Sequence, residues 1–287
     1  MMARYTEEAT LFDCAGSRLV GILARPQAPA ETGVVVIVGG PQYRAGSHRQ
    51  FTLLARRLAE TGHSTLRFDY RGMGDSEGEP RDFLNVTEDI AAAIGELQRL
   101  VPSVRKVALW GLCDGASAAL LYVQTTQDAR IRGLHLLNPW VRSAASLATT
   151  QVKHYYAQRL RQKEFWIKLA SGKVAASAVN ELMRAVRTMA SGSRSQDDAD
   201  TQTFQQRMAR GWRDARSNIM LVLSGTDYTA KEFLEHAGAD DAWKGLLDAA
   251  HVTRHDLPQA DHTFSNAAAR GEVEALTASW LQHNAAH

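Results

Sequence analysis

Residues 110–116 read WGLCDGA, and the cysteine at their centre is the first candidate for chemistry. Cys113 lies between Gly111 and Gly115, where an apolar strand pattern changes to a helix pattern. A strand, a tight turn and a helix in this order form a nucleophile elbow, which strains its central residue and needs small neighbours. The N-terminus of the following helix would lower the pKa of the thiol and favour the reactive thiolate. The alternative is a tight crossover with Cys113 as a small buried residue, and the pentapeptide alone favours neither.

A cysteine nucleophile needs a base, and the base needs an acid that orients it. His262 stands out among the ten histidines because it lies in a loop directly after the last expected strand. Asp227 follows the preceding strand, so the chain order is nucleophile, acid, histidine, although a turn or N-cap role would explain Asp227 equally. His255 would lie inside a strand, and Asp261 is too close to the histidine in sequence to orient its ring.

Acyl transfer also needs N–H groups that stabilise a developing oxyanion. We expect one from the backbone of Asp114, directly after the candidate nucleophile, and a second from the loop GGPQYRAGSH after the run VVVIV. Pro41 has no N–H to donate. Gln42 is therefore the first candidate for the second donor, followed by Gly40.

Strand and helix patterns alternate around these residues. Short Val- and Ile-rich runs bounded by glycine are typical of strands buried on both faces, and repeated strand–helix–strand units predict a mostly parallel sheet covered by helices on both faces. Residues 9–26 differ, because two short strands around AGS indicate an antiparallel hairpin. We expect further strands within 33–40, 63–72, 104–111, 131–139, 218–225 and 251–258, and helices at 51–62, 83–101 and 114–125.

From about residue 141 to about residue 213 the sequence contains no credible strand. This part is rich in Arg, Lys and Gln, and glycines close its segments. We therefore predict a helical cap over 141–213 on a core made of 1–140 and 214–287. Aromatic and aliphatic side chains in HYYAQRL and FWIKLA could line an acyl pocket beneath this lid, although ordinary packing against the core would use the same residues.

The composition is that of an ordinary globular protein: 287 residues, 45% of them hydrophobic, with a formal net charge of +2. This balance gives no electrostatic argument for nucleic acid as a partner. Cys14 and Cys113 make no disulfide framework and favour a reducing compartment. No apolar run is long enough to span a membrane, and the N-terminus lacks a signal-peptide core, so we expect a cytoplasmic enzyme. HDLPQADH falls on an expected strand and loop, so neither a metal nor a cofactor is predicted.

Together these features resemble the α/β-hydrolase superfamily, which implies a mostly parallel eight-stranded sheet with helices on both faces and a helical lid insertion. The hairpin start, VGGPQYR, DYRGMGDSEG, the elbow and the late Asp227 and His262 all correspond. In many members the loop similar to DYRGMGDS braces the active-site floor; without the resemblance, Asp69 and Arg71 would be interpreted as a structural ion pair. More narrowly, GGPQYRAGSHRQF, FDYRGMGDSEG and WGLCDGASAALLY resemble the exosortase A system-associated hydrolase 1 group, which accompanies bacterial exopolysaccharide and protein-sorting gene clusters.

Two positions depart from the superfamily pattern. Cys113 stands where most members have serine; members similar to dienelactone hydrolase also have cysteine there. Gly39 and Gly40 replace the usual His-Gly of the oxyanion loop. A thiolate that attacks a thioester exchanges one C–S bond for a similar one, so we expect a small acyl substrate carried on coenzyme A or an acyl-carrier protein, or an ester. The acyl-enzyme would pass to water in a hydrolase, or to an alcohol or amine in an acyltransferase. A C–C hydrolase, a lactonase and a non-catalytic binding protein of the same fold are the alternatives.

Overall fold

The computed structural model describes residues 5–40, 42–142 and 202–284, and an eight-stranded sheet forms the centre of these residues. Its strands are β1 (Tyr5–Cys14), β2 (Ser17–Pro26), β3 (Thr32–Ile37), β4 (Thr65–Phe68), β5 (Lys106–Leu112), β6 (Ile131–Leu137), β7 (Asn218–Ser224) and β8 (Val252–Leu257). Their order across the sheet is β1-β2-β4-β3-β5-β6-β7-β8. β2 pairs antiparallel with β1 and with β4, and every pairing from β4 to β8 is parallel. The predicted α/β class and mostly parallel sheet are confirmed.

The hairpin at one edge is longer than the sequence pattern indicated. β1 and β2 pair along their whole length, from Tyr5 opposite Pro26 to Cys14 opposite Ser17. The two residues of the turn, Ala15 and Gly16, both have positive φ, as a two-residue hairpin loop with the right twist requires.

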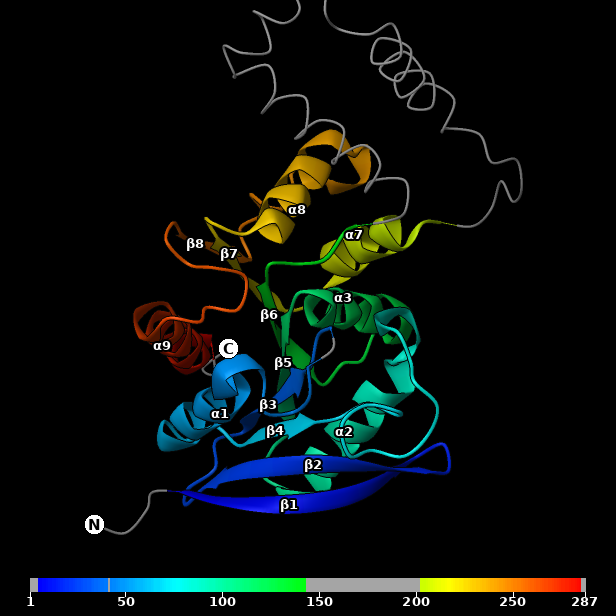
Figure 1. The fold of residues 1–287 in the computed structure, drawn as a ribbon, viewed down its shortest axis with the longest axis vertical. Helices are drawn as coiled ribbons and strands as arrows, with labels where there is room; N and C mark the ends of the chain where they lie inside the picture. The colour runs from blue at the N-terminus through cyan, green and yellow to red at the C-terminus, as the bar shows by residue number, and fades with distance from the viewer. Residues whose placement is uncertain (1–4, 41, 143–201, 285–287) are drawn as a thin grey trace, which may run out of the picture. The chain divides into compact units, whose positions relative to one another are not determined.

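Helices cover both faces of the sheet (Figure 1). In the described residues they are α1 (Gln50–Glu60), α2 (Thr87–Leu100), α3 (Asp114–Thr126), α7 (Phe204–Asp214), α8 (Tyr228–Ala239) and α9 (Ala267–Asn284), with short 3₁₀ turns at Ser47–Arg49, Phe83–Asn85 and Asp241–Trp243. α1 and α9 lie against one face, and α2, α3 and α7 against the other. None of these helices is long and apolar enough to cross a membrane.

The core consists of one apolar layer on each side of the sheet. Consecutive residues of β3 alternate between them: Val34 and Val36 pack into the layer under α1 and α9, whereas Val35 and Ile37 pack into the other. Since side chains alternate along a strand, both faces are buried only when every residue is apolar. The continuous Val/Ile run of β3 is therefore the signature of a central strand.

The helix α7 belongs to the core, although the sequence pattern included it in the cap. The chain divides into a unit of Met1–Val141 with Gln202–His287 and a second unit of Arg142–Thr201, so the core resumes before the expected residue 214. Met208 and Trp212 of α7 are fully buried. At Gly211 a Cβ would lie 2.1 Å from the Leu120 carbonyl oxygen, so glycine permits α7 to approach α3 closely. The remaining cap residues, 143–201, lie outside the described residues.

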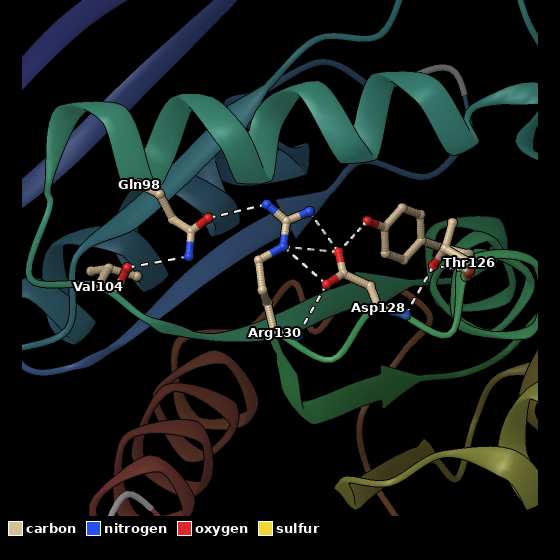
Figure 2. Close-up of polar contacts among 6 residues, drawn as sticks. Gln98, Val104, Thr126, Asp128 and Arg130 are labelled. Carbon is tan, nitrogen blue, oxygen red and sulfur yellow. Dashed lines mark hydrogen bonds and ion pairs between the residues drawn. The ribbon is translucent and has the colours of Figure 1, made fainter.

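A polar network anchors the C-terminal ends of α2 and α3 (Figure 2). The Arg130 guanidinium pairs with the Asp128 carboxylate at 2.7 Å and also donates to Gln98 of α2 at 3.1 Å. Tyr122 of α3 donates to Asp128 at 2.6 Å. Burial alone would raise the pKa of Asp128, but the bonds from Arg130 and Tyr122 outweigh it and lower the pKa to about 2. This network holds the C-terminal end of α3, whose N-terminal end carries the candidate nucleophile.

Candidate active site

Cys113 lies at the turn between β5 and α3, with φ 60° and ψ −126°. Positive φ is uncommon for a residue with a side chain, and such strain concentrates at functional sites. The two predicted glycines allow the turn to close. A Cβ at Gly111 would lie 2.4 Å from the Gly115 carbonyl oxygen, and a Cβ at Gly115 would lie 2.4 Å from that of Ile37. The turn therefore has the geometry of a nucleophile elbow, with the thiol half-buried.

His262 and Asp227 meet where β7 and β8 end, and the histidine Nδ1 lies 2.8 Å from the aspartate Oδ2. The Asp227 carboxylate is buried, and it also accepts hydrogen bonds from the backbone N–H groups of Thr229 and Ala230. It is therefore the N-cap of α8 as well as the partner of the histidine. Asp227 therefore makes the contacts that both interpretations of the sequence require, and its role as the orienting acid stays a prediction.

The Cys113 thiol lies close enough to the His262 ring to affect its pKa. The bond to Asp227 contributes most to raising the pKa of His262, the bond to Cys113 contributes next, and burial opposes both; the pKa rises from 6.5 to about 10. The ring is therefore protonated at neutral pH, with the carboxylate of Asp227 as its counter-charge. The nearby Asp261 accepts a hydrogen bond at 2.8 Å from the backbone of Ser265 instead of orienting the ring.

The loop after β3 packs directly on the elbow. The Gly40 N–H donates to Asp114 Oδ1 at 2.5 Å. The Gln42 side chain instead accepts hydrogen bonds from the Ser47 N–H and the Gln50 amide, near the start of α1. The Gly40 N–H therefore reaches the residue directly after Cys113, and the choice between Gly40 and Gln42 as second oxyanion donor stays a prediction.

Asp69 and Arg71 do not form the ion pair that their spacing indicated. Asp69 is fully buried, accepts from the Arg44 backbone N–H at 2.6 Å, and forms an ion pair with the Arg44 guanidinium. Arg71 pairs with Asp89 and Glu88, at 2.8 and 2.7 Å. The reason is that the chain turns after β4, so Asp69 faces the loop after β3 whereas Arg71 faces the first turn of α2.

Sequence reasoning missed one residue of the site, Asn138, which follows β6. Its side chain is fully buried, and its φ is 44°. The amide nitrogen donates to Ser224 Oγ at 2.9 Å and to the His262 carbonyl at 3.1 Å, while Oδ1 accepts from the Ser224 N–H at 2.9 Å. Asn138 thereby ties β6 and β7 to the loop that carries the histidine. Its position before a proline at a strand end was the only signal in the sequence.

No group of three or more His, Cys, Asp or Glu side chains could hold a metal ion within residues 5–40, 42–142 and 202–284.

A mostly parallel sheet of this order, with Cys113, Asp227 and His262 on loops at the carboxyl ends of its strands, is the α/β-hydrolase fold. Residues 29–227, more than half of the chain, match the family described as serine aminopeptidase, S33, and the chain belongs to that family. Cys113 occupies the centre of the elbow in this member.

Two curated proteins share part of the sequence. The quorum-quenching protein AidA of Acinetobacter baumannii is 34% identical over 116 residues, which cover 38% of this chain and 36% of that protein. Protein ABHD12B of Homo sapiens is 31% identical over 116 residues, which cover 38% of this chain and 31% of that protein. The matched stretch thus spans about a third of the length of each relative.

Two solved structures share the fold over nearly the whole chain. The esterase Pf2001 of Pyrococcus furiosus aligns over 97% of this chain and 91% of its own, with a TM-score of 0.64 and 14% identity. Est1E from Butyrivibrio proteoclasticus, whose structure holds ferulic acid, aligns over 97% of this chain and 100% of its own, with a TM-score of 0.61 and 14% identity. At such low sequence identity, the similarity is evidence for a shared fold alone.

Proposed function

We propose that the chain is an acyl hydrolase that works through a Cys113–His262–Asp227 triad and a covalent acyl-enzyme. The observation that carries this proposal is the position of the His262 ring, whose Nδ1 lies 2.8 Å from Asp227 Oδ2 and which lies beside the Cys113 thiol. A nucleophile, a base and an orienting acid linked in this way are what covalent acyl transfer requires.

In the proposed reaction the thiol proton of Cys113 passes to His262, which leaves Cys113 as the nucleophilic thiolate. The thiolate attacks the carbonyl carbon of the substrate, and the carbonyl electron pair moves to oxygen. When the intermediate collapses, the leaving thiol departs with the proton of His262. Water then attacks the acyl-enzyme while His262 takes its proton, the carboxylic acid leaves, and Cys113 returns as thiolate. Asp227 keeps the ring in place through both halves.

The substrate class that we propose is a thioester, carried on coenzyme A or an acyl-carrier protein. A cysteine and a thioester exchange similar C–S bonds, and the leaving thiol needs little help from an acid. Transfer of the acyl group to an alcohol or amine uses the same intermediate and is the alternative outcome.

The resemblance to the exosortase-associated group would place this reaction beside exopolysaccharide synthesis. The free thiols of Cys14 and Cys113 suit a reducing, cytoplasmic compartment.

Intact-mass analysis after incubation with acyl-CoA and aryl esters tests the proposal, with product release followed in parallel. We expect an acyl adduct or turnover on the native protein and neither on Cys113→Ala. Cys14→Ala is the matched control, because Cys14 is buried in the edge hairpin; this variant should react like the native protein. The absence of both adduct and turnover, or an undiminished adduct on Cys113→Ala, would contradict the triad. A Cys113 thiol that alkylates no faster than free cysteine would favour a non-catalytic binding protein.

A further inference from the structure

The carboxylate of Asp114 accepts hydrogen bonds from backbone N–H groups that a substrate oxygen would need. Its Oδ1 accepts from the Gly40 N–H at 2.5 Å, and the backbone N–H groups of Asp114 itself and of Gly115 also act on it. In an α/β hydrolase, the N–H after the nucleophile and an N–H of the loop after β3 form the oxyanion hole. We propose that the Asp114 side chain covers the oxyanion hole in the free enzyme and thereby determines which acyl carbonyls can enter it.

The packing around this carboxylate places it directly against the backbone of the loop after β3. A Cβ at Gly39 would lie 2.5 Å from Asp114 Oδ1 and 2.2 Å from the Leu112 carbonyl oxygen. The carboxylate therefore lies directly on the backbone of Gly39. There is room for it because Gly39, which replaces the usual histidine, has no side chain. A side chain at this position would displace the carboxylate.

The electrostatic environment of the Asp114 carboxyl group affects the oxyanion that forms during acylation. Burial raises the pKa of Asp114, and the N–H groups of the hole and the charge of His262 lower it less. The side chain thus brings a partly desolvated carboxyl group to the place where negative charge develops during acylation. An oxyanion and a carboxylate cannot accept from the same N–H groups, so Asp114 must turn away before the tetrahedral intermediate forms.

This inference rests on the proposed function and deepens it, because it selects among acyl substrates. Displacing the carboxylate costs free energy, which must come from binding of parts of the substrate remote from the carbonyl. A thioester with a long carrier arm can supply it, whereas a small ester has no such part. We therefore expect the native enzyme to discriminate strongly against small acyl compounds, and an enzyme without this carboxylate to lose that discrimination.

The test compares two reactions of Cys113 that differ in whether an oxyanion forms. Acylation by p-nitrophenyl acetate passes through an oxyanion, whereas alkylation by iodoacetamide does not. Both rates are measured on the native protein, on Asp114→Ala and on Asp114→Asn. Both variants keep the backbone N–H, and Asn keeps the shape of the side chain without its charge. Asp241→Ala, which also removes an acidic side chain from the first position of a helical turn, is the control.

We expect the ratio of acylation rate to alkylation rate to rise about tenfold or more in Asp114→Ala, since one oxyanion donor is worth about 10²–10³ in rate. Asp114→Asn should show a smaller rise, and Asp241→Ala none. Division by the alkylation rate removes any general change in thiol reactivity or folding. An unchanged or lower ratio in Asp114→Ala, or no acylation of any variant while Cys113 still alkylates, would overturn the inference.

The role of Asp114 and the proposed thioester substrate are tested separately. If the ratio rises in Asp114→Ala but no acyl-CoA or acyl-carrier protein acylates the native protein, the role of Asp114 stands and the thioester substrate fails. If acyl-CoA is turned over but the ratio is unchanged, the thioester substrate stands and the role of Asp114 fails.

Discussion

The side-chain amide of Asn138 donates to the backbone carbonyl of His262 at 3.1 Å, although 124 residues separate them in the chain. The same amide group bonds both the side chain and the backbone N–H of Ser224. One buried residue thus joins the end of β6, the end of β7 and the loop of the candidate base. This arrangement makes the geometry of the histidine dependent on a residue that touches no reacting atom.

Replacement of this residue tests that dependence. Asn138→Ala leaves a buried N–H and a buried carbonyl without partners, which costs about 1–3 kcal/mol each. We expect a lower free energy of unfolding in urea and a reduced kcat/KM, because the His262 loop loses its attachment. Asn85→Ala, at an exposed asparagine, should change neither quantity appreciably. Full activity of Asn138→Ala would show that the loop keeps its geometry without this bond.

The two roles of Asp227 are separable by substitution. Asn at this position keeps an oxygen that can cap α8 but loses the charge that stabilises the imidazolium, whereas Ala loses both. We expect acylation to fall on the order of 10³–10⁴-fold in both variants. Only Asp227→Ala should also lose about 1 kcal/mol of stability from the missing cap. Thermal unfolding and single-turnover kinetics distinguish the two effects, and equal stability of the variants would argue against the capping role.

The pKa of His262 predicts how stability changes with pH. The pKa is raised from 6.5 to about 10 by the bonds to Asp227 and Cys113, so the folded protein holds more protons than the unfolded chain between these values. The stabilisation is complete below pH 6.5 and is lost as pH rises toward 10. The difference in unfolding free energy between the native protein and His262→Gln should therefore decrease from pH 7 to pH 10. A difference that stays constant over this range would mean that the ring is not protonated in the folded state.

The Arg44–Asp69 pair predicts a strong coupling energy. Asp69 is fully buried, so Arg44→Met leaves an unpaired carboxylate in the interior, which costs about 3–5 kcal/mol. In Arg44→Met with Asp69→Asn, that charge is absent. We expect the double variant to be more stable than the sum of the single effects predicts, by about 1 kcal/mol or more. Urea unfolding of all four proteins measures this, and strictly additive effects would show that the pair is not coupled.

A pair of glycine substitutions tests the elbow. Gly111→Ala places a Cβ 2.4 Å from the backbone of Gly115, so the turn must open and Cys113 must shift. We expect loss of stability and of Cys113 acylation. The control is Gly95→Ala in α2, where a Cβ meets nothing within 4 Å. This substitution should stabilise the protein by about 0.5–1 kcal/mol, because alanine is the better helix former.

Much of the fold follows from local patterns in the sequence. The Val/Ile run of β3 indicates a strand buried on both faces, and the spacing of Phe51, Leu54 and Leu58 indicates a helix with one buried face. The chain order of Cys113, Asp227 and His262 also predicts their meeting. Each residue follows a strand, and the carboxyl ends of parallel strands lie at one edge of the sheet.

Contacts between side chains on different elements depended on the tertiary structure. Neighbours in the sequence suggested a pair of Asp69 with Arg71, but the turn after β4 directs them to different elements. The assignment of α7 to the core depends on a close approach to α3 that only the packed structure reveals.

The elbow illustrates both what the sequence determines and what the tertiary structure determines. The sequence alone determined that a cysteine stands at the strained turn between a strand and a helix, because glycine spacing and hydrophobic periodicity are local properties. Only the tertiary structure placed the Asp114 carboxylate on the Gly40 N–H, 74 residues away in the chain. That contact arises because β3 and β5 are adjacent parallel strands, so the loop after one and the helix after the other must share the same small space.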